Sequence, residues 1–217
     1  MSSALISKLS SQLAAARQTD TDGRHARAAE AYTQVIQGTL ALRNKQPPDS
    51  NEVQEPTQFT LRHQLTVLLS EASSSAGYNL LKNFQQPQAL QSFKDALKYA
   101  QELENADPSG CRLYKGYAYA GMSQAYHPKG HDDPRRSEYA NKAKALAHSL
   151  LDDVCQAYAD VGGEFVLDTQ APETRLMANR FIAGDAVEDT TLTSNILKAR
   201  MLVAAAERAS AMARVSK

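Results

Sequence analysis

Residues 77–108 decide the fold and read GYNLLKNFQQPQALQSFKDALKYAQELENADP. Small residues, Gly77 and Ala89, stand where two antiparallel helices would cross, and Phe93 is placed to fill the space beside them. The sequence Asp107-Pro108 then ends the segment with turn chemistry. The spacing therefore predicts a closely packed helix pair on which further pairs can stack, a design that serves binding more often than chemistry.

The composition is neutral and rich in small residues. The 217 residues include 24 basic and 24 acidic side chains, only ten glycines and eight prolines, and 6% aromatics. This balance favours helices packed through small residues in one domain or a short solenoid. Zero net charge supplies no general attraction for phosphates, so we expect no nucleic-acid partner.

The sequence has neither the pattern of a secretory signal nor that of a membrane span, and this favours a cytoplasmic location. Residues 1–16 carry Lys8 within a mixed Ser/Leu/Ala stretch, which does not match the apolar core of a secretory signal. No stretch reaches the roughly 18 apolar residues that a membrane span needs. Cys111 and Cys155 lie far apart, and we expect both to be buried small hydrophobes. We expect a cytoplasmic protein without a membrane partner.

Apolar residues recur at helical spacing along the whole chain, and no convincing period-two alternation occurs, so the sequence predicts an all-α fold. Polar loops are expected over about 46–55 and 127–133. The expected helices lie near residues 5–18, 24–43, 56–83, 87–106, 111–126 and 134–159, with a seventh beginning after Pro172 and an eighth over 191–215.

The 77–108 segment resembles a tetratricopeptide repeat. With Gly77 at the eighth position of a 34-residue repeat, three further positions (20, 24 and 27) carry suitable small or aromatic residues. They are Ala89, Phe93 and Ala96. The same frame matches an earlier helix pair at Ala16, Ala28, Tyr32 and Val35, and a later one at Tyr117, Ala120 and Gly121, then Ala140, Lys144 and Ala147.

The resemblance implies antiparallel helix pairs stacked as a short solenoid over a single domain, 1–217. The repeat-like units span about 9–42, 70–105 and 114–150, and helices over about 172–215 follow them. The insertion at 127–133 lengthens the third unit. An ordinary helical bundle, in which Ala and Gly allow close packing without shared ancestry, is the alternative.

The resemblance also implies an adaptor, chaperone-like binder or assembly factor that holds a peptide or partner protein in a helical-repeat groove. Tyrosine and lysine side chains on the third and fifth helices suit such contacts. The expected groove residues are Tyr78, Lys82, Lys115, Tyr119 and Met122.

Many members of the repeat family clamp the acidic C-terminal tail of a chaperone through Lys and Asn side chains. In this sequence only Lys115 agrees with that clamp, so most of the charge-assisted hydrogen bonds to a carboxylate would be missing. We therefore do not expect this ligand class. The five clamp positions hold Leu13, Arg17, Ser75, Lys115 and Tyr119.

Positive signs of chemistry are lacking. His127 and His131, followed by Asp132 and Asp133, have metal-binding side chains, but the prolines and glycines between them favour a solvated loop. Gly162-Gly163 lacks the remainder of a phosphate loop. We expect no enzyme, metal or cofactor. The alternative is a helical enzyme or ligand sensor whose site is assembled from distant residues, which a deep pocket with converging His, Asp or Glu would favour.

The final predicted helix, 191–215, admits two interpretations. Its apolar stripe can cover the last repeat as a capping helix, with the charged residues facing water. The other interpretation is a homodimer seam. The stripe consists of Leu192, Ile196, Ala199, Val203 and Ala206.

Overall fold

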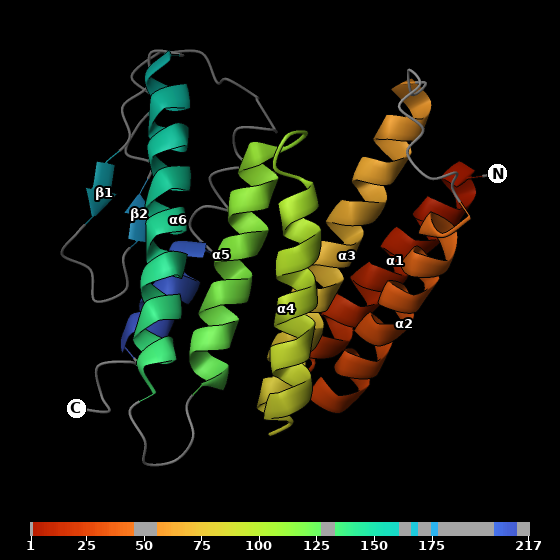
Figure 1. Cartoon of the computed structure of the whole chain (residues 1–217), viewed down its shortest axis with the longest axis horizontal. Helices are drawn as coiled ribbons and strands as arrows, with labels where there is room; N and C mark the ends of the chain where they lie inside the picture. Colours follow the sequence, from red (N-terminus) through yellow and green to blue (C-terminus); the bar gives the residue numbers. More distant parts are fainter. Residues whose placement is uncertain are drawn as a thin grey trace.

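The computed structural model describes residues 2–45, 56–126, 133–160, 166–168, 175–177 and 202–211. The described chain is essentially all-α, as the sequence predicts (Figure 1). Residues 202–211 form a further helical segment. The six long helices are α1 (Ser2–Thr21), α2 (His25–Arg43), α3 (Pro56–Lys82), α4 (Gln86–Glu102), α5 (Pro108–Ala125) and α6 (Pro134–Asp160).

Consecutive helices run antiparallel and form three pairs, α1/α2, α3/α4 and α5/α6 (Figure 1). The pairs are stacked because α3 also contacts both α1 and α5, so that α1, α3 and α5 make one row. Helices α2, α4 and α6 make no comparably extensive contact with one another. This arrangement of helix pairs confirms the predicted solenoid-like stacking.

The first two pairs repeat each other closely. From Ala16 to Gly77 is 61 positions, and the same offset relates the other three matched residues of the two pairs. All eight residues are buried, which places both frames on the core. They are Ala16, Ala28, Tyr32 and Val35 in α1/α2, and Gly77, Ala89, Phe93 and Ala96 in α3/α4.

The predicted frame of the third pair is wrong by one residue on α5 and by one helical turn, four residues, on α6. Helices α1 and α3 end five residues after Ala16 and Gly77, and α5 ends five residues after Ala120, not Gly121. On α6, Ala143 is buried whereas the expected Lys144 is exposed. The three α6 positions that match the core of α4 are Arg136, Ala140 and Ala143, all at most 2% exposed.

The ring of Phe93 lies where α3, α4 and α5 meet. It is fully buried, and two glycines give it room. A Cβ at Gly77 would lie 2.6 Å from Cε1 of Phe93, and a Cβ at Gly121 would overlap the same ring. Because no L-residue with a side chain fits at either position without moving the ring, the three helices can approach only through glycine.

We predict that Gly77→Ala and Gly121→Ala each lower the free energy of unfolding by about 1–3 kcal/mol, because the added methyl overpacks the ring. An ordinary helical Gly→Ala change would raise it by about 0.5–1 kcal/mol. Urea unfolding measures the difference. In a Phe93→Leu background the Gly121→Ala change should cost less, and strict additivity of the two changes would contradict this packing.

Helices α1 and α3 end in the same backbone motif at the lower edge of Figure 1. At α1, the N–H groups of Gly23 and Arg24 bond back to Asp20 and Thr19. At α3, those of Phe84 and Gln85 bond back to Leu81 and Leu80. The central residue of this motif takes a left-handed conformation, which favours glycine. After α1 this left-handed residue is Gly23, with φ 75°. After α3 it is Phe84, with φ 60°, although phenylalanine has a side chain.

We predict that Phe84→Gly raises the free energy of unfolding by about 0.5–1 kcal/mol, because it relieves the left-handed strain at the cost of some chain entropy. The matched change Gly23→Ala should lower it by about 1 kcal/mol for the opposite reason. Both are measured by chemical denaturation of the monomeric chain. A loss of stability in Phe84→Gly would show that the ring makes a stabilising contact.

Residues 202–211 cap the third pair. Leu202 and Ala206 are buried against α5 and α6 in one core cluster, and a Cβ at Gly116 would lie 2.7 Å from a methyl of Leu202. This confirms the capping interpretation. Of the predicted apolar stripe, Val203 and Ala206 are buried within the chain, while Leu192, Ile196 and Ala199 lie outside the described residues. The homodimer seam stays a prediction.

A short hairpin corrects the expected helix after Pro172. Strand β1 (Val166–Asp168) pairs antiparallel with β2 (Arg175–Met177), with Leu167 opposite Leu176. Three-residue strands are too short to show a period-two pattern, which explains the error. Residues 46–55, 127–132 and 162–163, with the rest of the expected seventh helix, lie outside the described residues.

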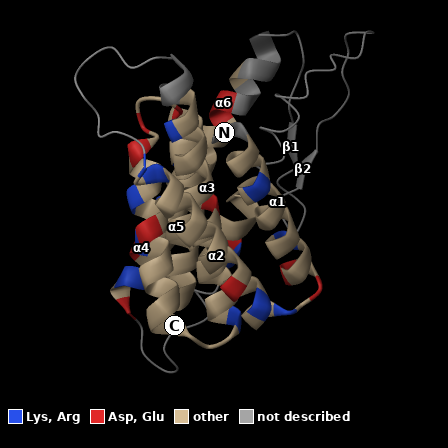
Figure 2. Cartoon of the chain, turned by 90° about the vertical axis from the view of Figure 1, so that its right-hand side faces the viewer, with Lys and Arg blue, Asp and Glu red and all other residues tan. Residues whose placement is uncertain are grey.

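Cys111 is buried, as expected for a small hydrophobe, while the side chain of Cys155 lies outside the described part. None of the helices described has the length and apolar character needed to cross a lipid bilayer. Acidic and basic residues are interspersed on the face formed by α1 and α2 (Figure 2).

Candidate binding surface

The five residues predicted to line a groove do not converge. Lys115 and Tyr119 are one turn apart on α5 and share a side of that helix. Tyr78 instead contacts α5 at Tyr117, about 200° around the helix from Tyr119. The one-residue error in the frame of the third pair explains this, because one residue turns a side chain by about 100°.

Tyr78 is a structural residue between α3, α4 and α5. Its hydroxyl donates a hydrogen bond to the backbone carbonyl of Tyr117 at 3.0 Å. Its ring meets that of Phe93 edge to face, with centroids 5.1 Å apart and planes at 76°. Burial raises the pKa of Tyr78 well above its usual value, so the hydroxyl remains a donor. These contacts pack Tyr78, which is partly buried, against the core cluster around Phe93.

Lys82 belongs to a polar network that ties the end of α3 to the α1–α2 turn. Its Nζ lies 3.0 Å from Oδ1 of Asp20, and Nδ1 of His25 lies 3.1 Å from the same oxygen. Nδ1 of His25 is also 3.1 Å from Oδ1 of the buried Asn79. Burial alone would raise the pKa of Asp20, but the hydrogen bonds from Lys82, Asn79 and His25 outweigh it and lower the pKa.

We predict that this network loses stability in acid. Because the folded-state pKa of Asp20 is lowered, its contribution is present above the unfolded-state pKa and is lost as pH falls through the folded pKa. Wild type should exceed Asp20→Asn by at most about 1 kcal/mol at neutral pH, with the gap closing below pH of about 4. Urea unfolding at several pH values measures it.

The control for this experiment is Asp22→Asn, which removes an exposed carboxylate two residues away and keeps every partner of Asp20. Its stability difference from wild type should be smaller and should not follow the same pH dependence. An Asp20→Asn gap that stays constant down to pH of about 2 would contradict a titrating network.

Lys115 and Met122 are less accessible than expected. The Lys115 side chain is 18% exposed, and its Nζ lies 3.8 Å from a carboxylate oxygen of Glu104. Met122 is 3% exposed and belongs to the core cluster around Phe93, so its expected role in a groove is corrected. Met122 faces α4 because it follows Ala118 by one helical turn.

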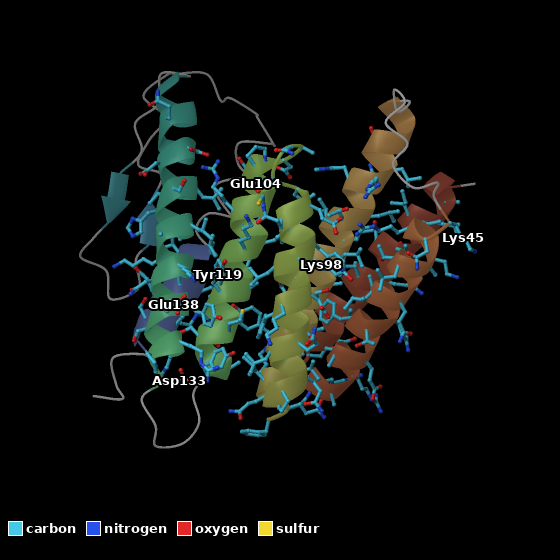
Figure 3. The ribbon with its side chains drawn as sticks, viewed as in Figure 1. Lys45, Lys98, Glu104, Tyr119, Asp133 and Glu138 are labelled. Atoms are coloured by element: carbon cyan, nitrogen blue, oxygen red, sulfur yellow. The ribbon has the colours of Figure 1, made fainter. Side chains whose placement is uncertain are left out.

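Tyr119 is the member of the predicted set that lies in an aromatic surface cluster. The tyrosine cluster consists of Tyr119 on α5, Tyr126 at the C-cap of α5, and Tyr139 on α6. The Tyr139 ring is stacked with Tyr119 at 5.8 Å and with Tyr126 at 5.6 Å, the planes differing by 15° and 19°. All three side chains are half-buried. Tyr119 lies between α5 and α6 in Figure 3.

Two cations on α6 border the tyrosine cluster. Arg135 places its guanidinium 4.3 Å from the centroid of Tyr126. Lys142 places its Nζ 5.6 Å from the Tyr119 centroid and 5.4 Å from that of Tyr139. These are cation–π distances. The cations thus lie over the rings while 56% of the Arg135 side chain and 47% of the Lys142 side chain stay exposed.

Acidic residues balance these cations. Arg135 pairs with Asp133 at 2.6 Å, and Lys142 pairs with Glu138 at 2.5 Å. Both acids are labelled along α6 in Figure 3. Burial chiefly raises the pKa of Tyr139, so its hydroxyl stays protonated at neutral pH. The surface therefore presents ring edges and hydroxyls with little net charge.

Tyr139 is not among the groove residues predicted from the sequence. The available signal was the spacing of Arg135, Tyr139 and Lys142, four and three residues apart, which places them on one face of α6. What the sequence could not supply was the rotation of α5 that turns Tyr119 and Tyr126 toward that face.

The row formed by α1, α3 and α5 has its own polar contacts. Arg17, at one of the five positions compared with the chaperone-tail clamp, forms an ion pair with Glu71 of the same chain. Leu13, at another clamp position, is 3% exposed. Burial raises the pKa of Tyr114 and of Tyr117, which packs against the core beside residues 202–211. Arg17 and Leu13 thus both have contacts within the chain, and the absence of a carboxylate clamp stays a prediction.

A recess of about 400 Å³ lies between α2 and the α3–α4 turn and is open to solvent. Glu30 is its one acidic lining residue, and amide side chains supply half of the remainder. Across the described residues, no three His, Cys, Asp or Glu side chains come together as a metal site. The recess therefore lacks the converging titratable groups that catalysis requires.

Comparisons with known proteins give no relative. No protein-family model matches the chain, and no match is found among curated proteins or solved structures.

Proposed function

We propose that this protein is a protein–protein interaction scaffold whose contact surface is the tyrosine cluster with Arg135 and Lys142. The observation that carries the proposal is the stack of three half-exposed tyrosines bridging α5 and α6, with a cation over each end. Tyrosine and arginine are enriched where protein interfaces concentrate their binding energy.

The side chains of this surface are already held in place. Each ring is stacked on another, and both cations are paired with carboxylates on α6. A partner that binds here would immobilise few additional rotamers, so less of the contact energy would be lost to ordering. Preorganisation of this kind favours reversible capture of a protein surface or peptide.

The chemistry of the surface also limits the partner. Because Arg135 and Lys142 are balanced by Asp133 and Glu138, strong acidity in the partner is not required. Ring edges and tyrosine hydroxyls suit a partner that combines apolar side chains with exposed backbone or amide acceptors. We place the predicted peptide or protein partner on this outer side of α5, with Lys115 one turn from Tyr119.

The alternative function, an enzyme or ligand sensor with a site assembled from distant residues, needs acidic or histidine side chains that converge in a pocket. The recess beside α2 is open and holds one acidic residue. It gives that alternative no support.

We predict that the double variant Arg135→Glu/Lys142→Glu weakens partner binding by at least about tenfold, because it removes both cation–π contacts and turns two cations into anions. Affinity purification from the native cell with quantitative mass spectrometry, followed by titration of the recovered partner, measures the loss. Thermal unfolding verifies that the variant remains folded.

The matched control is Lys94→Glu/Lys98→Glu, which makes the same charge change on exposed residues of α4. Lys98 is labelled in Figure 3, on α4 and away from the tyrosine cluster. The control should retain its partners. Equal loss in both variants would mean that net charge drives binding, and unchanged partners in both would refute this surface.

A further inference from the structure

Phe84 combines two unfavourable features that the fold does not require. Its side chain is 93% exposed, and its backbone is left-handed at φ 60°. The equivalent turn after α1 satisfies the same hydrogen-bond pattern with Gly23. Both the strain and the exposed ring are therefore specific to the α3–α4 turn, and retained strain of this kind is characteristic of functional positions.

The residues on either side of Phe84 line the recess beside α2. Asn83 and Gln85 are among its lining residues, so the exposed ring and the recess belong to one surface patch. Two of the less exposed lining residues, the buried Ala29 and the half-buried Leu80, supply an apolar floor. The rim is formed largely by neutral amide and hydroxyl side chains, so an aromatic ring could enter without burying a charge other than Glu30.

We propose that two copies of this chain associate about a two-fold axis, with Phe84 of each copy inserted into the α2 recess of the other. A two-fold interface uses the same patch on both subunits, and this patch contains both a projecting ring and a recess. The recess, at about 400 Å³, is large enough to admit an aromatic ring.

A second copy fits this patch better than a charged partner does. The chain has zero formal net charge, so two copies meet without overall repulsion. The side chains next to Phe84 are amides, Asn83 and Gln85, which can exchange hydrogen bonds across a two-fold axis because an amide both donates and accepts. The contact is small, which predicts weak and reversible dimers.

This inference stands apart from the tyrosine cluster, because no residue is common to the two surfaces. A dimer joined through the α3–α4 turns would use Phe84 and the α2 recess and none of the residues of the tyrosine cluster. It would present two such surfaces together and could bind a bivalent partner more tightly than a monomer.

The absence of tryptophan from the chain allows a direct test. In Phe84→Trp the new indole is the sole tryptophan and keeps an aromatic ring at the tip of the turn. Its emission should move to shorter wavelength as protein concentration rises, in parallel with dimer formation measured by sedimentation equilibrium. Emission typical of exposed indole at every concentration would overturn the proposal.

Two variants separate the ring from the recess. Phe84→Gly removes the ring at a backbone position that glycine favours, so it should fold while dimerisation weakens by at least about tenfold. Ala26→Arg places a long charged side chain at an exposed position of the recess and should weaken dimerisation similarly. The control, Leu5→Ala, removes another exposed apolar side chain and should leave dimerisation unchanged.

Mixing the two variants gives the decisive measurement. Phe84→Gly retains the recess and Ala26→Arg retains the ring, so the mixture should form heterodimers with one of the two contacts while each variant alone stays monomeric. A wild-type chain that is monomeric at high concentration overturns the proposal. Phe84 would then have to contact a different protein or no protein. Wild-type affinity in Ala26→Arg overturns insertion into the recess.

Discussion

The ring of Phe93, held between Gly77 and Gly121, is the constraint on which the rest of the structure depends. It belongs to α4 but occupies the space where α3 and α5 would otherwise separate, and it is fully buried there. Tyr78 reinforces the same junction, because its ring meets that of Phe93 edge to face and its hydroxyl donates a hydrogen bond to the backbone of α5. Three helices from two successive pairs are thereby fixed at one point, so the stacking of the pairs follows from the packing of a single side chain.

Fixing α5 at this junction also determines which of its side chains reach the outer surface. With Gly121 turned toward Phe93, Tyr119 lies about 200° around the helix and points toward α6, where it meets Tyr139. The tyrosine cluster is thus a consequence of core packing and not of a flexible surface. Rings held by a rigid pair of helices lose little freedom on binding, and this links the Phe93 junction to the proposed contact surface.

The first two helix pairs could be predicted from the sequence because two small residues and an aromatic residue recur at the same spacing. Gly77, Ala89 and Phe93 of the second pair stand at the same relative positions as their counterparts in the first pair. The sequence did not locate the third pair correctly, for two reasons. Ala140 stands where the first two pairs have an aromatic residue. The spacing is also longer, because Arg136 follows Ala120 by 16 positions whereas Ala89 follows Gly77 by 12. Without an aromatic to fix the frame, Gly121 looked like the crossing residue of its own pair. Its small size serves Phe93 of the preceding pair instead, a tertiary requirement that no local spacing reveals.

The same comparison between pairs bears on the α3–α4 turn. Two turns with the same hydrogen bonds carry Gly23 in one case and Phe84 in the other, so local backbone energetics favour glycine in both. An aromatic ring at the second turn costs stability through strain and gains none from burial, because it is exposed. Because no contact within the described part of the monomer offsets the strain at Phe84, a stabilising contact for its ring would have to come from association with another chain. The recess formed by the neighbouring residues of the same turn provides an associated state of suitable shape within the chain itself.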